Sequence, residues 1–216
     1  MARYLLNRHW LALLGLALAQ RAAGSSVSGS ITLPAGGAVA SAVVFVQAPS
    51  PSTARPHATA VVDQVEKTFV PGLLPIVVGT YVRFPNHDQV QHHVYSFSPT
   101  KTFELPLYRG EDAPPVLFDK VGVVKIGCNI HDWMSGIILV LPTEHFAVTD
   151  ASGHYVLKDL PEGSYTLVVW HALSSLKPEN TARTIQVRDD VANVNFTLAL
   201  SAARSRPAVH GSRPEP

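Results

Sequence analysis

Residues 122–141 read GVVKIGCNIHDWMSGIILVL, in which two apolar runs flank a short polar segment. Valine and isoleucine runs bounded by glycine are typical of β-strands, so the sequence predicts strands at 122–128 and 136–141 joined by a tight loop. Cys128, His131 and Met134 stand at three-residue intervals across that loop. Because side chains alternate along an extended strand, only a loop can direct all three toward one point.

These three side chains offer a thiolate sulfur, an imidazole nitrogen and a thioether sulfur, which together favour a metal ion. One thiolate, two imidazoles and a weak axial thioether suit copper that cycles between its two oxidation states. Zinc is the main alternative, but it prefers a closed tetrahedron of Cys, His or carboxylate ligands and has no use for a thioether. Met134 therefore favours one copper ion over zinc.

A second imidazole is available in residues 84–94, which read FPNHDQVQHHV. We interpret this stretch as the end of one strand, a turn, and the start of another strand at His92 and His93. Alternation lets only one of these adjacent histidines face the site. His87 lies in the turn and is a substitute, whereas the remaining histidines are expected to be surface residues: His57, His145, His154, His171 and His210.

Residues 58–141 resemble the cupredoxins, the blue-copper proteins that include plastocyanin, pseudoazurin and amicyanin. In that family the first histidine ligand lies in a His-Asn-Val triplet at the start of a strand, and His92-His93-Val94 is the matching triplet. The resemblance implies a type 1 copper site with His92, Cys128, His131 and Met134 as ligands. It also makes His93 and Asn129 the candidates for hydrogen bonds around the ligands, with exposure to solvent as the alternative.

The loop spacing Cys-x-x-His-x-x-Met is closest to that of amicyanin, the electron carrier of methylamine oxidation. Two positions depart from the family. Ile130 replaces the proline that usually precedes the loop histidine, so the loop lacks one fixed φ angle. Asp132 and Trp133 follow His131 where the family tends to have an apolar docking patch, which leaves the choice of partner open.

The mature chain is expected to be all-β, because short strand-like runs recur between turns and no sustained helical periodicity is present. The predicted strands are 26–32, 41–47, 58–64, 74–84, 92–97, 102–105, 116–119, 122–128, 136–141, 146–150, 155–160, 163–171, 182–187 and 191–199. Short strands at this spacing favour sandwiches, and the resemblance implies a Greek-key cupredoxin β-sandwich plus a small second β-sandwich.

The second sandwich is expected from residues 149–155, TDASGHY, and 160–165, LPEGSY, which read as a meander of strands and tight turns. They resemble the carboxypeptidase regulatory-like domain, a transthyretin-like sandwich, and residues 29–46 fit the first half of that family. The cupredoxin domain is then an insertion in a split sandwich, which is tolerated where the insert's termini lie close together. Alternatively, residues 24–56 add strands to the cupredoxin and the C-terminal module stands alone.

The expected domains are a signal peptide at 1–23, N-terminal strands and a linker at 24–56, the cupredoxin domain at 57–142, the regulatory-like sandwich at 143–200 and a disordered tail at 201–216. Arg3 and Arg8 precede an apolar run at 10–19 that is too short for a permanent membrane anchor. We therefore expect a periplasmic or secreted protein that has no membrane span once the signal peptide is cleaved. Cys128 then meets an oxidising compartment with no second cysteine to pair with, which supports a metal-bound thiolate.

The expected function is single-electron transfer between redox partner proteins. Seventeen basic and 16 acidic residues nearly cancel, so no strong field attracts nucleic acid. An enzyme is not expected, since four protein ligands leave no open metal position for a substrate. The alternatives are a copper-binding or delivery protein that does not cycle its redox state, and a metal-free structural or adhesion protein.

Overall fold

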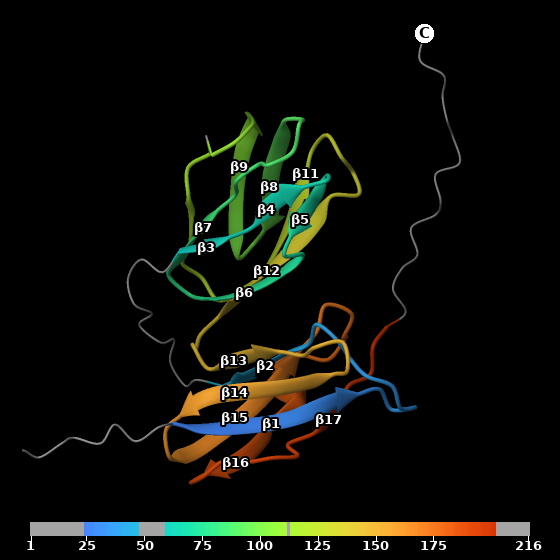
Figure 1. Ribbon diagram of the computed structural model, residues 1–216, viewed down its shortest axis with the longest axis vertical. Helices are drawn as coiled ribbons and strands as arrows, with labels where there is room; N and C mark the ends of the chain where they lie inside the picture. The colour runs from blue at the N-terminus through green and yellow to red at the C-terminus, as the bar shows by residue number, and fades with distance from the viewer. Residues whose placement is uncertain (1–23, 48–58, 112, 202–216) are drawn as a thin grey trace, which may run out of the picture.

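The computed structural model describes residues 24–47, 59–111 and 113–201, and these residues form two stacked bodies of β-strands (Figure 1). Their only helical element is the short 3-10 helix η1, Pro178–Thr181. The prediction of an all-β chain is therefore confirmed. Within the described residues, no helix is both long and apolar enough to span a membrane. The predicted signal peptide, most of the linker and nearly all of the tail lie outside the described residues.

The first sandwich, the upper body in Figure 1, is built from residues 59–141. Its larger sheet has the order β6 (Leu73–Val77), β12 (Ser135–Leu141), β11 (Gly122–Cys128), β8 (His92–Ser98), β9 (Lys101–Tyr108). Its smaller sheet has the order β10 (Val116–Phe118), β7 (Thr80–Arg83), β3 (Thr59–Val61). A separate hairpin is formed by β4 (Asp63–Val65) and β5 (Thr68–Val70).

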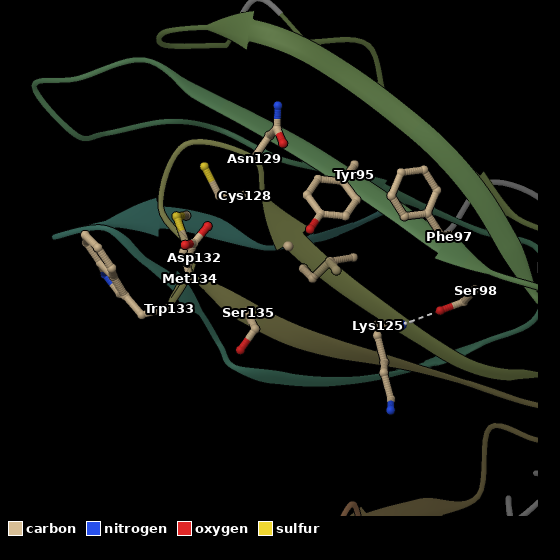
Figure 2. Close-up of a pocket in the computed structure, with 12 residues that line it drawn as sticks. Tyr95, Phe97, Ser98, Lys125, Cys128, Asn129, Asp132, Trp133, Met134 and Ser135 are labelled. Atoms are coloured by element: carbon tan, nitrogen blue, oxygen red, sulfur yellow. Dashed lines mark hydrogen bonds between the residues drawn. The ribbon is translucent and has the colours of Figure 1, made fainter. Parts of the chain in front are cut away.

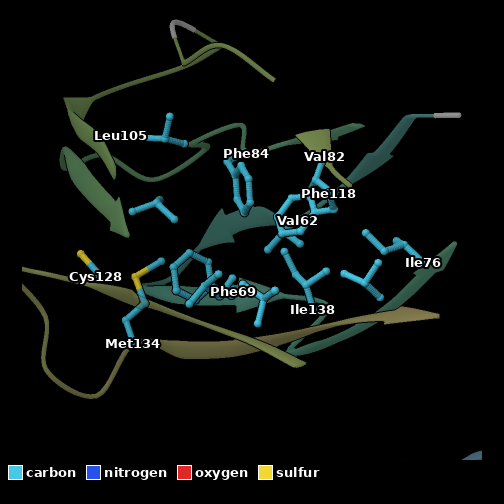
Figure 3. Packing of buried hydrophobic residues seen from close by; sticks show 14 of the residues in the cluster. Val62, Phe69, Ile76, Val82, Phe84, Leu105, Phe118, Cys128, Met134 and Ile138 are labelled. Carbon is cyan, nitrogen blue, oxygen red and sulfur yellow. The ribbon is translucent and has the colours of Figure 1, made fainter. Parts of the chain in front are cut away.

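The core of this sandwich is apolar and rich in aromatic rings (Figure 3). Phe69, Phe84 and Phe118 are fully buried, and burying such a side chain stabilises the fold by roughly 1.5–3 kcal/mol. Cys128 and Met134 belong to the same cluster and lie beside each other at one end of it (Figure 3). Both sulfur-bearing residues are therefore shielded from water by the core itself.

The second sandwich, the lower body in Figure 1, combines strands from both parts of the chain. One sheet has the order β14 (His154–Leu160), β1 (Ser25–Thr32), β17 (Phe196–Thr197). The other has the order β13 (Phe146–Val148), β2 (Val43–Val46), β15 (Gly163–Trp170), β16 (Arg183–Val187). Since β1 and β2 pair only with strands that follow residue 145, the first sandwich lies between the two halves of the second in sequence.

An apolar contact joins the two sandwiches. Strand β2 is buried on both faces, because Val44 and Val46 belong to the core of the second sandwich while Val43 and Phe45 face the first. The latter pair packs in one cluster with Val168 of β15 and with Leu139 and Leu141 of β12. The strand that leaves the first sandwich is therefore held directly against the second.

Three predicted strands are divided or largely lost in the structure. The expected strand 74–84 is divided into β6 and β7 by a turn at Gly79, whose φ of 89° favours glycine. The expected strand 58–64 is likewise divided into β3 and β4, and β5 was not predicted. The expected strand 191–199 is reduced to Phe196–Thr197, because Asn195 accepts hydrogen bonds through its side chain from Ser30 instead of pairing through its backbone.

Candidate metal centre

The loop between β11 and β12 brings three of the predicted ligands together, as the sequence spacing indicated. Strand β11 ends at Cys128 and β12 begins at Ser135. The backbone N–H of Cys128 donates to the carbonyl of Met134 at 3.1 Å, and the N–H of Met134 donates to the carbonyl of His131 at 2.9 Å. These two bonds close the loop, so its shape is set by the main chain although Ile130 replaces a proline.

Strand β8 supplies the fourth predicted ligand. His92, Val94 and Ser96 alternate inward and are fully buried, whereas His93 and Tyr95 face outward. Val94 pairs with Cys128 across the sheet, so the start of β8 lies beside the end of β11. The register of β8 against β9 shifts between His92 and Val94, a β-bulge of the kind that redirects side chains near functional sites.

The potential ligand atoms of His92, Cys128 and His131 all lie within 4.8 Å of one another. The Nδ1 atoms of the two histidines are each 3.6 Å from Cys128 Sγ, and the imidazole rings meet edge to face with centroids 4.9 Å apart. Met134, only 2% exposed, packs in the same cluster as Cys128. Two imidazole nitrogens directed at a buried sulfur, with a thioether nearby, fit a type 1 copper site.

The electrostatics of His131 favour its metal-binding form. Its pKa is lowered mainly by desolvation, and further by the nearby His92 and the positive charge of Lys67, against a smaller opposing effect of Asp88. A lowered pKa keeps the imidazole neutral at pH values where a free histidine would begin to protonate. The Nδ1 lone pair therefore stays available to a metal ion.

Asp88 is the residue of this site that the sequence interpretation missed. Its Oδ2 atom is 2.6 Å from His92 Nε2, and its side chain is only 11% exposed. Burial acts to raise the pKa of Asp88, but the hydrogen bond from His92 and the backbone N–H groups of Lys67 and Glu66 outweigh burial and lower it. Asp88 is therefore a carboxylate that accepts a hydrogen bond from the Nε2–H of His92, which leaves the Nδ1 lone pair of His92 facing Cys128.

A buried polar network supports the segment that carries Asp88. Gln64 Nε2 donates to the Tyr108 hydroxyl oxygen at 2.6 Å and to the carbonyls of Phe84 and Pro85 at 3.1 Å. The Tyr108 hydroxyl donates in turn to the Phe84 carbonyl at 2.6 Å, and desolvation raises the pKa of that hydroxyl so that it stays protonated. Asn86 Nδ2 donates to the carbonyls of Val90 and Tyr108. These hydrogen bonds hold the turn before His92 in place.

The structure decides between the alternatives left open for the surroundings of the ligands. The two ligand segments are bridged by the main chain, since the N–H of Asn129 donates to the carbonyl of His93 at 3.1 Å, whereas the Asn129 side chain is exposed. His93 Nε2 instead lies 2.8 Å from Glu104 Oε1 on β9. His87 does not join the cluster, because its Nδ1 atom lies 2.8 Å from a carboxylate oxygen of Asp63.

The surface around the cluster is apolar on one side. Ile130 is 49% and Trp133 60% exposed, and the Trp133 ring lies 5.3 Å from that of half-buried His131. An open groove of about 1080 Å³ passes Cys128 and Met134 and continues along β8 and β11 (Figure 2). Tyr95 and Phe97 line it, and neither histidine of the cluster does. Asp132 also borders this groove.

No protein-family model matches this chain, and neither does any curated protein. Several solved structures do. A purple cupredoxin from Nitrosopumilus maritimus is 28% identical over 39% of this chain and 99% of its own, with a TM-score of 0.34. The Cu-containing nitrite reductase NirK from Thermus scotoductus is 27% identical over 44% of this chain and 27% of its own, with a TM-score of 0.37. A reduced point mutant of amicyanin is 22% identical over 45% of this chain and 98% of its own, with a TM-score of 0.36.

Proposed function

We propose that this chain holds one copper ion between His92, Cys128, His131 and Met134 and transfers single electrons between redox partner proteins. The observation that carries the proposal is the approach of two histidine Nδ1 atoms to 3.6 Å from one buried cysteine sulfur. A soft thiolate, two imidazoles and a nearby thioether match the ligand preferences of copper better than those of zinc.

Bound copper supplies the one-electron chemistry, and the residues of this chain determine how easily it proceeds. Cys128, His92 and Met134 come from buried positions whose backbones are tied by hydrogen bonds, so their donor atoms have little freedom to move. A rigid set of donors disfavours large changes in coordination when the oxidation state changes. His131 is the half-buried member, and with exposed Ile130 and Trp133 it offers partner proteins the shortest approach to the site.

The proposal also covers the cellular location and the domain organisation of the chain. We place the mature protein in the periplasm or outside the cell because residues 1–23 read as a signal peptide, and a metal-bound thiolate would keep the lone cysteine from oxidation there. We also propose that the copper domain, 57–142, is inserted in a regulatory-like sandwich formed by 24–56 and 143–200. The pairing of β1 with β14 and of β2 with β15 supports this division.

Copper loading followed by optical absorption tests the proposed function. The loaded protein is expected to bind one copper ion and to show an intense thiolate-to-copper band that vanishes on reduction and in Cys128→Ser. His92→Ala should abolish the band, whereas His93→Ala, its matched neighbour on the outer face of β8, should only shift it. A colourless protein that binds Cu(I) alone would indicate copper delivery, and a protein that binds no copper would exclude both functions.

A further inference from the structure

The turn of the β4–β5 hairpin has an unusual backbone. Its two central residues, Glu66 and Lys67, have φ angles of 50° and 56°. Positive φ at both central positions is typical of a type I′ turn, where asparagine and glycine are preferred because other side chains are strained. The chain therefore keeps two unfavourable residues in the left-handed region at this position.

The turn directs both of its amide groups at one carboxylate. The N–H of Glu66 lies 2.5 Å from Asp88 Oδ1, and the N–H of Lys67 lies 2.8 Å from Asp88 Oδ2. Successive amides of a turn form a small concave site for an anion. Since Asp88 Oδ2 also accepts from His92 Nε2, three donors surround this carboxylate and fix its plane.

We propose that the Glu66–Lys67 turn and Asp88 form a positioning relay that sets the orientation and donor strength of His92. This inference rests on the proposed copper site and adds Glu66, Lys67 and Asp88 to the residues that shape it. The turn amides donate hydrogen bonds to Asp88, and Asp88 accepts a hydrogen bond from the Nε2–H of His92. The Nδ1 lone pair is thereby aimed at Cys128, from which it is separated by 3.6 Å.

An anionic acceptor on Nε2 also changes the electronic character of the ring. It pulls the Nε2 proton toward itself, which raises the basicity of Nδ1 as a ligand. A more basic nitrogen stabilises the higher charge of Cu(II) more than that of Cu(I). The relay is therefore expected to lower the reduction potential of the site. A carboxylate that merely fastened the hairpin to the turn at 86–90 would leave the potential unchanged.

Asp88→Asn tests the relay, with Glu104→Gln as a matched control. Glu104 lies 2.8 Å from the Nε2 atom of His93, the neighbour that faces outward, without hydrogen-bond geometry, and thus places a carboxylate beside an imidazole outside the proposed ligand set. Asp88→Asn should weaken Cu(II) binding about tenfold more than Cu(I) binding, a change in the range seen for outer-shell partners. For a one-electron couple that difference raises the reduction potential by about 59 mV. Glu104→Gln should leave both affinities and the potential unchanged.

Lengthening the turn tests the contribution of the hairpin. Insertion of Gly-Ser between Glu66 and Lys67 separates the two amides and should reproduce the effect of Asp88→Asn. The same insertion between Gly36 and Gly37, an exposed turn of the second sandwich with open space around it, should change nothing at the copper site. An unchanged potential in Asp88→Asn and in the lengthened hairpin would overturn the relay.

A measurement without metal separates the failure of the relay from the failure of the copper site. In the apo-protein, nitrogen-detected NMR of the imidazoles should find His92 protonated on Nε2 with a strongly hydrogen-bonded proton. The change in chemical shift that this hydrogen bond causes at His92 Nε2–H should disappear in Asp88→Asn and remain in Glu104→Gln. A His92 protonated on Nδ1 in the wild type would overturn the relay whether or not copper binds.

Discussion

The two sandwiches of this chain are alike in their apolar packing and differ in where they bury polar side chains. In the first sandwich, Gln64, Asn86 and His92 are at least 97% buried and gather around the turn that leads into β8. In the second, Thr149 is buried and bonds only to backbone groups at Val39 and Ala42. Buried polar groups are costly unless they are paired, so a group of three beside the metal-capable cluster supports the proposed function at this end of the first sandwich.

This contrast indicates that the second sandwich is a scaffold whose core can be changed without changing the metal-capable cluster of the first. The second sandwich packs its core of valine and leucine under β1 and β14, and of the residues that the structure describes it contributes none to the metal-capable cluster. The first sandwich uses the same kind of core, but Cys128 and Met134 form part of it. Changes to the two cores should therefore have similar effects on stability and different effects on copper.

Truncation of one large side chain in each core should give the largest effects. Phe69→Ala removes a ring that lies next to Met134 (Figure 3) and should reduce the free energy of unfolding by about 3–5 kcal/mol. Leu167→Ala in the second sandwich should cost about 2–5 kcal/mol. Only Phe69→Ala should also alter the copper band, which absorption spectra and urea unfolding of both variants would reveal. A changed band in Leu167→Ala would argue against separable parts.

Removal of one buried polar group from each sandwich should give an intermediate effect. Gln64→Leu removes the side-chain donor to the Tyr108 hydroxyl, whereas the carbonyls of Phe84 and Pro85 keep bonds from Tyr108 and from the backbone N–H of residue 64. Thr149→Val strands the amide of Ala42 and the carbonyl of Val39. Thr149→Val should therefore cost about 1–3 kcal/mol by the penalty for unpaired buried groups, and Gln64→Leu should cost less. Gln64→Leu should in addition weaken copper binding, because the turn that it supports carries Asp88. Equal copper affinity in Gln64→Leu and Thr149→Val would contradict a functional role for the network.

The smallest effect is expected at the exposed link between β1 and the segment after β16. Asp190 accepts hydrogen bonds from the N–H and the hydroxyl of Ser26 at 2.7 and 2.9 Å, and these bonds lower its pKa below the usual 3.8. A lowered aspartate pKa stabilises the fold above pH 3.8, and the gain is lost as pH falls through the lowered value. Asp190→Asn should therefore be less stable than wild type at neutral pH and nearly equal in strong acid, by denaturant unfolding. The copper band should not respond.

The strand pattern and the ligand loop could be predicted from the sequence because both depend on local spacing. Cys128, His131 and Met134 follow one strand end at fixed intervals. Alternation lets only one of His92 and His93 face the site, and the family triplet selects His92. The structure accordingly brings His92 inward and turns His93 outward. The break at Gly79 escaped the strand prediction, since a continuous apolar run hides a turn that one glycine permits.

Asp88 could not be found in the same way, because its role depends on a contact between segments. The amides that hold it belong to Glu66 and Lys67, 22 and 21 residues earlier in the chain. The one local signal is its position four residues before His92, and such spacing carries no weight outside a helix. The bridge at His93 and Asn129 was expected between side chains and is made by the backbone, whose partners depend on strand register.

Voltammetry of the copper-loaded protein tests the central claim most directly. We expect one reversible one-electron wave per chain, at a potential that does not drift over repeated cycles, and no such wave in Cys128→Ser loaded with the same amount of copper. A wave that persists in Cys128→Ser, or a wild-type protein that binds copper and shows no reversible wave, would contradict electron transfer at this site.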